Sequence, residues 1–164
     1  MEFRLLGPLE VVSRDRSLLV GGGKRRSLLA ILLLHPNEVV SAERLIDELW
    51  GEQPPATAAK SVHVYVSQLR KVLRPDSAGA NGGLLTTRSG GYELRVGPDD
   101  VDVARFERAV ADAELAMGRG DAARAAGALR AALALWRPGA GELCLRAVCA
   151  GRDRAAGGAA AGGA

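Results

Sequence analysis

The stretch that most restricts the fold is KSVHVYVSQLRKVLR at residues 60–74. Successive side chains on an α-helix turn by about 100°, so a helix here gathers its apolar residues on one face. That face, which is expected to pack on a core, consists of Val62, Tyr65, Val66, Leu69, Val72 and Leu73. The opposite face is polar and basic, but Val64 lies in its middle. The sequence therefore predicts an amphipathic helix with one apolar residue left on its polar face.

The surroundings of this helix lack acidic residues. No Asp or Glu occurs between Glu52 and Asp76, although the formal net charge of the whole chain is only +3. Solvated helix faces usually mix both signs, because opposite charges three or four residues apart stabilise the helix. The one-sided charge favours a nucleic-acid-binding face over an ordinary solvated one.

Short strands and two helices are expected before this helix. Residues 3–20 alternate and turn like a small antiparallel sheet. KRRSLLAILLLH, at 24–35, is apolar nearly all round, which predicts a buried helix that Pro36 ends. The next helix is expected to begin after Ser41, a good N-cap, and to stop at Gly51.

A connector with two prolines, residues 51–56, leads to Thr57, the predicted N-cap of a helix that continues through Arg74. Two helices with the second one basic are a helix-turn-helix candidate with a long connector. Segments 84–88 and 92–96 then flank a Ser-Gly-Gly tip, which predicts a β-hairpin. This order predicts an α+β fold: a winged helix-turn-helix with an N-terminal antiparallel sheet and a C-terminal hairpin, over residues 1–98.

Two further helices, 102–118 and 121–136, are predicted after Pro98, with Asp102 and Asp121 as their N-caps. Their expected core residues are Val103, Phe106, Val110, Met117, Leu129, Leu133 and Trp136. The pair looks like one unit of a helical repeat, which cannot bury its apolar face alone. Residues 99–137 are therefore expected to form a partial, all-α second domain. Residues 138–164, rich in Ala and Gly, have no amphipathic period and are expected to be disordered.

Several functional classes are disfavoured. No apolar run reaches the roughly 20 residues that span a bilayer, and the first residues do not resemble a secretory signal. A soluble cytoplasmic protein is expected. Cys144 and Cys149 lack a metal-ligand spacing, and His35 and His63 are the only histidines. No metal, cofactor or catalytic constellation is expected, and an enzyme is not predicted.

In order, the segments GGGKRRSLLAILLLHPNEVVSAERLIDELWGEQPPATAAKSVHVYVSQLRKVL, LLTTRSGGYELRV, VDVARFERAV and ALRAALALW resemble the Streptomyces antibiotic regulatory protein family. Those proteins join an OmpR-type winged-helix DNA-binding domain to a bacterial transcriptional activation domain of helical repeats. The resemblance covers residues 1 to about 137. There the family usually continues LWRG with further apolar helices, and this chain reads LWRPGAGEL, so the activation domain is expected to be truncated.

The resemblance implies binding to direct repeats upstream of biosynthetic gene promoters, with a homodimer on the repeats as one arrangement, and recruitment of RNA polymerase. Polymerase contact is expected at the connector, through Gly51, Glu52 and Gln53. The residues expected at double-stranded DNA are Lys60, Ser61, His63, Val64, Ser67, Gln68, Lys71, Arg74 and Arg88.

The major groove admits one α-helix and exposes the thymine methyl, which a small apolar side chain can cover. Val64 is placed for that contact, and Gln68 is suited to bridge an adenine edge. The cations of the helix are expected at phosphates, and Arg88 is expected to reach the backbone or the minor groove. His63 is as consistent with a bystander as with a phosphate contact, and Arg25 and Arg26 are expected to be solvated.

Two other interpretations stay open. In one, the helical pair binds a protein partner and the winged helix is a passive platform. In the other, the chain is a truncated product that binds DNA but does not activate transcription. A phosphorylation-driven response regulator is disfavoured, because no receiver domain precedes residue 1.

Overall fold

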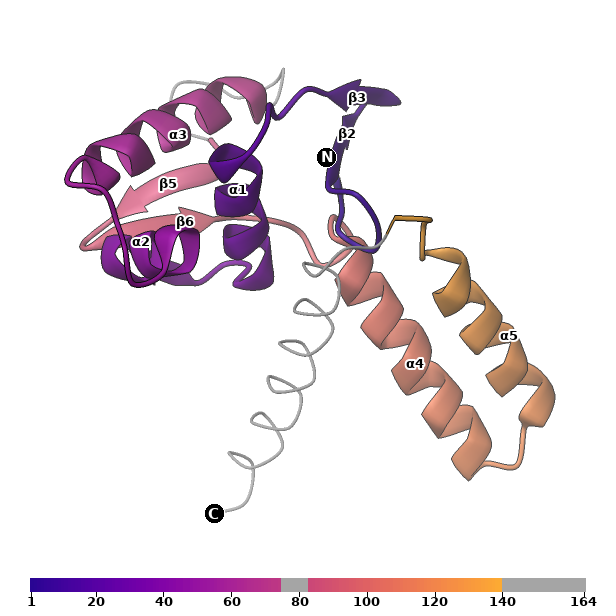
Figure 1. Ribbon diagram of the computed structural model, residues 1–164. Helices are drawn as coiled ribbons and strands as arrows, with labels where there is room; N and C mark the ends of the chain where they lie inside the picture. The colour runs from indigo at the N-terminus through magenta and orange to yellow at the C-terminus, as the bar shows by residue number, and fades with distance from the viewer. Residues whose placement is uncertain (75–82, 140–164) are drawn as a thin grey trace, which may run out of the picture. The chain divides into compact units, whose positions relative to one another are not determined.

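The computed structural model describes residues 1–74 and 83–139, which form parts of two compact units (Figure 1). The first unit contains residues 11–97, and the second joins residues 2–10 to the chain from Pro98 onward. The sequence order does not suggest this second grouping. The expectation of disorder after residue 139 falls on residues outside those described.

Three helices build the core of the first unit: α1 (Lys24–Leu34), α2 (Ala42–Trp50) and α3 (Ala58–Val72). Every residue from Leu28 to Leu34 is buried, which confirms the prediction of a buried first helix. The core side of α3 is as predicted: its fully buried side chains are Val62, Val66 and Leu69, with Leu73 directly after the helix. Tyr65 and Val72 are half-buried.

Both residues predicted as helix caps in this unit, Ser41 and Thr57, are at the N-cap position, but only Ser41 makes a capping hydrogen bond. The Ser41 side chain accepts a hydrogen bond from the Arg44 N–H, so α2 is capped as expected. The Thr57 side chain makes no such bond, because its backbone (φ −94°, ψ 10°) is near-helical, whereas a capping residue is normally extended. The helix also ends at Val72, with Leu73 as its C-cap, instead of continuing through Arg74.

A three-stranded antiparallel sheet completes the first unit. Its strands are β4 (Val39–Ser41), β6 (Gly91–Leu94) and β5 (Leu85–Arg88), in that order. The β5–β6 hairpin, hereafter the wing, is confirmed. Sequence analysis did not predict β4, which has only three residues and directly precedes α2. Gly91 is needed where β6 meets β4, because a Cβ there would lie 2.2 Å from the carbonyl oxygen of Val40.

An antiparallel strand pair is present where the small N-terminal sheet was predicted. Strands β2 (Glu10–Ser13) and β3 (Arg16–Leu18) pair antiparallel, with Val12 opposite Ser17. The turn uses Arg14 and Asp15 in left-handed conformations, with φ of 47° and 59°. Two consecutive positive φ values match the twist of the flanking strands.

The second unit contains β1 (Glu2–Arg4), α4 (Asp102–Gly118) and α5 (Ala122–Ala134). The two helices run antiparallel side by side (Figure 1). Small residues fill their interface: Ala113, Ala116 and Ala125 form a buried cluster with Ala128 packed against it.

The predicted large anchors of these helices are partly wrong. Met117, Leu129 and Leu133 are 63%, 44% and 66% exposed. The physical reason is that alanines let the helix backbones approach closely, so the alanine face is the one turned inward. Phe106 and Trp136 are half-buried and meet edge to face, with ring centroids 5.9 Å apart.

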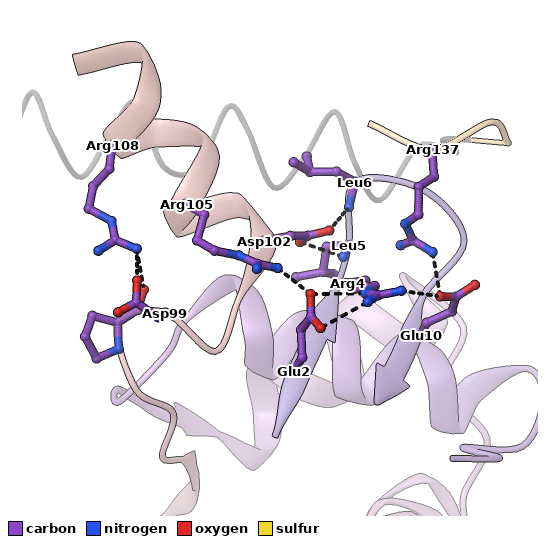
Figure 2. Close-up of polar contacts among 11 residues, drawn as sticks. Glu2, Arg4, Leu5, Leu6, Glu10, Asp99, Asp102, Arg105, Arg108 and Arg137 are labelled. Carbon is purple, nitrogen blue, oxygen red and sulfur yellow. Dashed lines mark hydrogen bonds and ion pairs between the residues drawn. The ribbon is translucent and has the colours of Figure 1, made fainter. Parts of the chain in front are cut away.

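Asp102 binds the N-terminal segment instead of capping α4. Its carboxylate accepts hydrogen bonds from the N–H groups of Leu5 and Leu6, at 2.7 and 2.9 Å (Figure 2). The N-cap position belongs to Val101, which has no capping side chain. Asp102 is only 2% exposed, and this burial raises the pKa of its carboxyl although the two backbone donors act in the opposite direction.

Ion pairs surround this contact (Figure 2). Glu2 accepts hydrogen bonds from Arg4 and Arg105, and these bonds lower the pKa of its carboxyl to about 2. Arg137, just after α5, pairs with Glu10 at 2.8 Å, and its N–H donates to the carbonyl of Leu6. Residues 2–10 are thus joined by polar contacts to the start of α4 and to the residue range just after α5.

Replacing Asp102 by Asn tests this attachment. The amide has a single acceptor oxygen, so one buried N–H of Leu5 or Leu6 loses its partner. We expect the unfolding free energy to fall by about 1–3 kcal/mol, measured by denaturant unfolding of the full chain. The control is Asp112→Asn at an exposed position of the same helix. Equal stability of the two variants would contradict the assigned role of Asp102.

Candidate nucleic-acid interface

The outward face of α3 gathers the side chains predicted to contact DNA. Lys60, His63, Val64, Ser67 and Lys71 are exposed, and Arg74 is exposed directly after the helix. Ser61 and Gln68 are half-buried at its border. No acidic residue occurs in α3.

Val64 is the apolar member of this face. It is 44% exposed, whereas Val62 and Val66, two positions away on either side, are each 1% exposed. The same residue type therefore serves two faces of one helix. The burial of Val62 and Val66 fixes the rotation of α3, and that rotation places Val64 outward.

Arg70 fastens α3 to the wing. Its Nε donates to the carbonyl of Leu85 at 3.0 Å, and its Nη2 donates to Oγ1 of Thr87 at 2.6 Å. Both acceptors are on β5, which lies alongside α3 (Figure 1). This role of Arg70 is not predicted from the sequence, because its acceptors come from a strand about 15 residues later.

His63 forms a second connection between α3 and the sheet. The hydroxyl of Tyr92, on β6, lies 3.4 Å from Nδ1 of His63, and the two rings meet edge to face with centroids 6.1 Å apart. Together with the Arg70 bonds, this contact connects α3 to both strands of the wing.

Arg88, near the wing tip, is paired with Glu93. Its Nε lies 2.6 Å from Oε2 of Glu93, and Arg95 approaches the other oxygen at 3.2 Å. The bonds from these two guanidinium groups lower the pKa of the Glu93 carboxyl, with Arg88 the larger cause. The strand register could have revealed the pair, since Arg88 is opposite Gly91 and Glu93 is the next residue on that face.

Arg25, on α1, contacts Gln68 on α3. Its Nη1 donates to Oε1 of Gln68 at 2.9 Å. Arg25 and Arg26 were both expected to be solvated, but both are half-buried. Gln68, one of the side chains predicted to contact a base, is therefore hydrogen-bonded to another residue of the chain.

The connector between α2 and α3 is open to solvent. Residues 51–57 are all exposed, including Gly51, Glu52 and Gln53. Gly51 has a φ of 65°, which lets the chain leave α2 in a left-handed conformation. Beside it, the ammonium group of Lys24 lies 5.7 Å from the ring centroid of the half-buried Trp50.

Comparison with known proteins identifies the family. Residues 17–94 match the family described as "Transcriptional regulatory protein, C terminal", and residues 101–157 match "Bacterial transcriptional activator domain". The chain is 40% identical over 137 residues to the regulatory protein AfsR of Streptomyces coelicolor, and 36% identical over 141 residues to the regulatory protein DnrI of Streptomyces peucetius. The chain belongs to the Streptomyces antibiotic regulatory protein family. This is a family of transcriptional regulators and not an enzyme class.

These family members are longer than the chain. The matches cover 83% and 84% of this chain, but 13% of AfsR and 52% of DnrI. A solved structure of Mycobacterium tuberculosis EmbR in complex with a low affinity phosphopeptide superposes with a TM-score of 0.77 at 35% identity, over 87% of this chain and 38% of EmbR. The predicted fold, a winged helix followed by a helical segment, is confirmed.

None of the helices within 1–74 and 83–139 is long and apolar enough to cross a bilayer. Over the same ranges, no group of three or more His, Cys, Asp or Glu side chains is arranged to hold a metal ion.

A pair of substitutions tests the rotation of α3. Val64→Ala is expected to change the unfolding free energy by less than about 0.5 kcal/mol, because the side chain is exposed. Val66→Ala removes two buried methyl groups and is expected to cost about 2 kcal/mol. Thermal or denaturant unfolding of both variants measures the difference. Similar losses would show that Val64 is part of the core.

Proposed function

We propose that the chain is a sequence-specific DNA-binding transcriptional regulator that activates a biosynthetic gene cluster for a secondary metabolite such as an antibiotic. In this proposal α3 enters the major groove of double-stranded DNA and the wing lies against the adjacent backbone. The observation that carries it is the acid-free outward face of α3, with exposed Val64 among exposed cations and hydroxyl groups.

The residues of this face divide into two roles. Val64 covers the methyl group of a thymine, which only the major groove exposes. Lys60, Lys71 and Arg74 neutralise phosphates, which gives affinity and register but no sequence information. Ser61, His63 and Ser67 lie on or beside the same face and complete the contact surface.

The wing contributes Arg88. Because Glu93 holds its guanidinium at the base of the tip, the side chain loses little conformational freedom when it meets the backbone or the minor groove. The same carboxylate neutralises part of the charge, so Arg88 is expected to add less to affinity than an unpaired arginine.

Transcription activation adds two partners to the proposal. Two copies of the chain occupy adjacent direct repeats, and the exposed connector, through Gly51, Glu52 and Gln53, contacts RNA polymerase. The support is the family membership together with the exposure of residues 51–57.

A second candidate is a protein-interaction module, which is favoured by the exposed apolar residues of the second unit. Leu115, Met117, Leu129 and Leu133 are each at least 44% exposed. A gel-shift assay with genomic fragments separates the two candidates, because only the DNA-binding regulator retards specific fragments.

The salt dependence of DNA binding tests the phosphate contacts. Exposed Lys60 and Lys71 of α3, Arg74 directly after it, and the partly paired arginines predict a slope of log K against log salt of roughly −3 to −5. Lys71→Glu should weaken binding to all sequences alike and reduce the slope by about 1. Titrations over a range of salt concentrations measure both quantities.

The matched control is Arg130→Glu, the same kind of charge change at an exposed position of α5. It should leave the slope unchanged. Salt-independent binding, or no binding at about 50 mM salt, would exclude the DNA-binding function.

A further inference from the structure

Gln68 is oriented by a residue from a different helix. Arg25 is in the first turn of α1, and its Nη1 donates to Oε1 of Gln68, on α3, at 2.9 Å. Both side chains are half-buried. The Nε atom of the same guanidinium is buried and has no hydrogen-bond acceptor among the described residues.

The chemistry of arginine decides which way the amide points. A guanidinium group has five N–H donors and no acceptor, and it stays charged at all relevant pH values. The atom of Gln68 that faces it must therefore be the oxygen, and the NH₂ group must point elsewhere. An amide without such a partner can rotate by 180° and exchange its oxygen and nitrogen.

Gly21 makes room for this arginine. A Cβ at position 21 would lie 1.4 Å from Nη2 and 2.3 Å from Cζ of Arg25, and Gly21 has a φ of 85°. Any other residue there would have to displace the guanidinium. The missing side chain of Gly21 thus leaves space for the Arg25 guanidinium. The guanidinium in turn orients the amide of Gln68.

We propose that Arg25 is a specificity-determining residue that acts by positioning Gln68. With its oxygen held by Arg25, Gln68 presents its NH₂ donors to the base edges. It therefore selects a base whose major-groove edge offers only acceptors, which is guanine (N7 and O6) or thymine (O4). This inference rests on the proposed DNA-binding function and adds to it the class of base that one residue reads.

The base that Gln68 selects in this arrangement differs from the base that a glutamine with a freely rotating amide selects. A free Gln pairs with adenine by accepting from N6 and donating to N7, which was the expectation from sequence. That pairing needs the amide oxygen at the base edge, and Arg25 holds this oxygen on the protein side. Loss of Arg25 should therefore admit adenine at the position that Gln68 reads.

The experiment is selection of bound duplexes from a random pool, with the full chain and four variants. Gln68→Leu identifies the base position that Gln68 reads. Arg25→Met removes the donor at similar length, and Gly21→Ala displaces the guanidinium but keeps its charge. Arg26→Met is the control for loss of one positive charge on the same turn of α1. Thermal melting confirms that each variant is folded.

At the Gln68 position, the wild-type chain is expected to prefer guanine or thymine over adenine by about tenfold. Arg25→Met and Gly21→Ala should both reduce this ratio to near one, and Arg26→Met should leave it intact. Preferences at all other positions should stay as in the wild type.

Two outcomes would overturn the inference while leaving DNA binding in place. One is a wild-type preference for adenine at the Gln68 position. The other is an unchanged base preference in Arg25→Met together with a uniform, salt-dependent loss of affinity, which would make Arg25 a phosphate contact. If the wild-type chain selects no sequence at all, the proposed function itself fails, and this result is distinct from both.

Discussion

The burial of the apolar stripe of α3 against α1 and α2 is the constraint on which the interface depends. Val62, Val66 and Leu69 are each at most 1% exposed, and burying three such side chains is worth several kcal/mol. No rotation of α3 keeps them buried and also changes its outward face. The position of Val64 is therefore a consequence of packing on the other side of the helix.

Polar contacts then position the parts that packing alone leaves free. Arg70 joins α3 to β5, Tyr92 meets His63, and Arg25 holds the amide of Gln68. Each of these bonds links α3 to another element of the first unit. A surface prepared in this way loses less conformational entropy on binding, which favours affinity and specificity together.

The second unit is held together by different interactions. Its helices approach through alanines, and a buried carboxylate, Asp102, ties residues 2–10 to the start of α4. The apolar residues left outside, such as Leu133, remain available to further helices or to a partner. The chain accounts for about half of DnrI and less of AfsR.

Sequence reasoning predicted the features that depend on local pattern. The apolar period of α3, the uniform apolarity of α1, the Ser41 cap and the β5–β6 hairpin all depend on local pattern, and each is confirmed.

The features that the sequence could not reveal depend on residues far apart in the chain. The role of Asp102, for example, depends on backbone donors nearly 100 residues earlier. The inward face of α4 and α5 was predicted wrongly because large side chains were weighted above alanines, although alanines permit closer backbone approach. The contacts that orient His63 and Gln68 also come from other elements.

The most direct measurement of the central claim is a double-mutant cycle between Val64 and a thymine methyl. The selected DNA site is prepared with each thymine in turn replaced by uracil, which lacks that methyl group, and is titrated with the wild-type chain and with Val64→Ala. For one thymine, uracil and Val64→Ala should each weaken binding by on the order of 1 kcal/mol, and the two together should cost no more than one alone. Fully additive losses at every thymine would contradict the placement of α3 in the major groove.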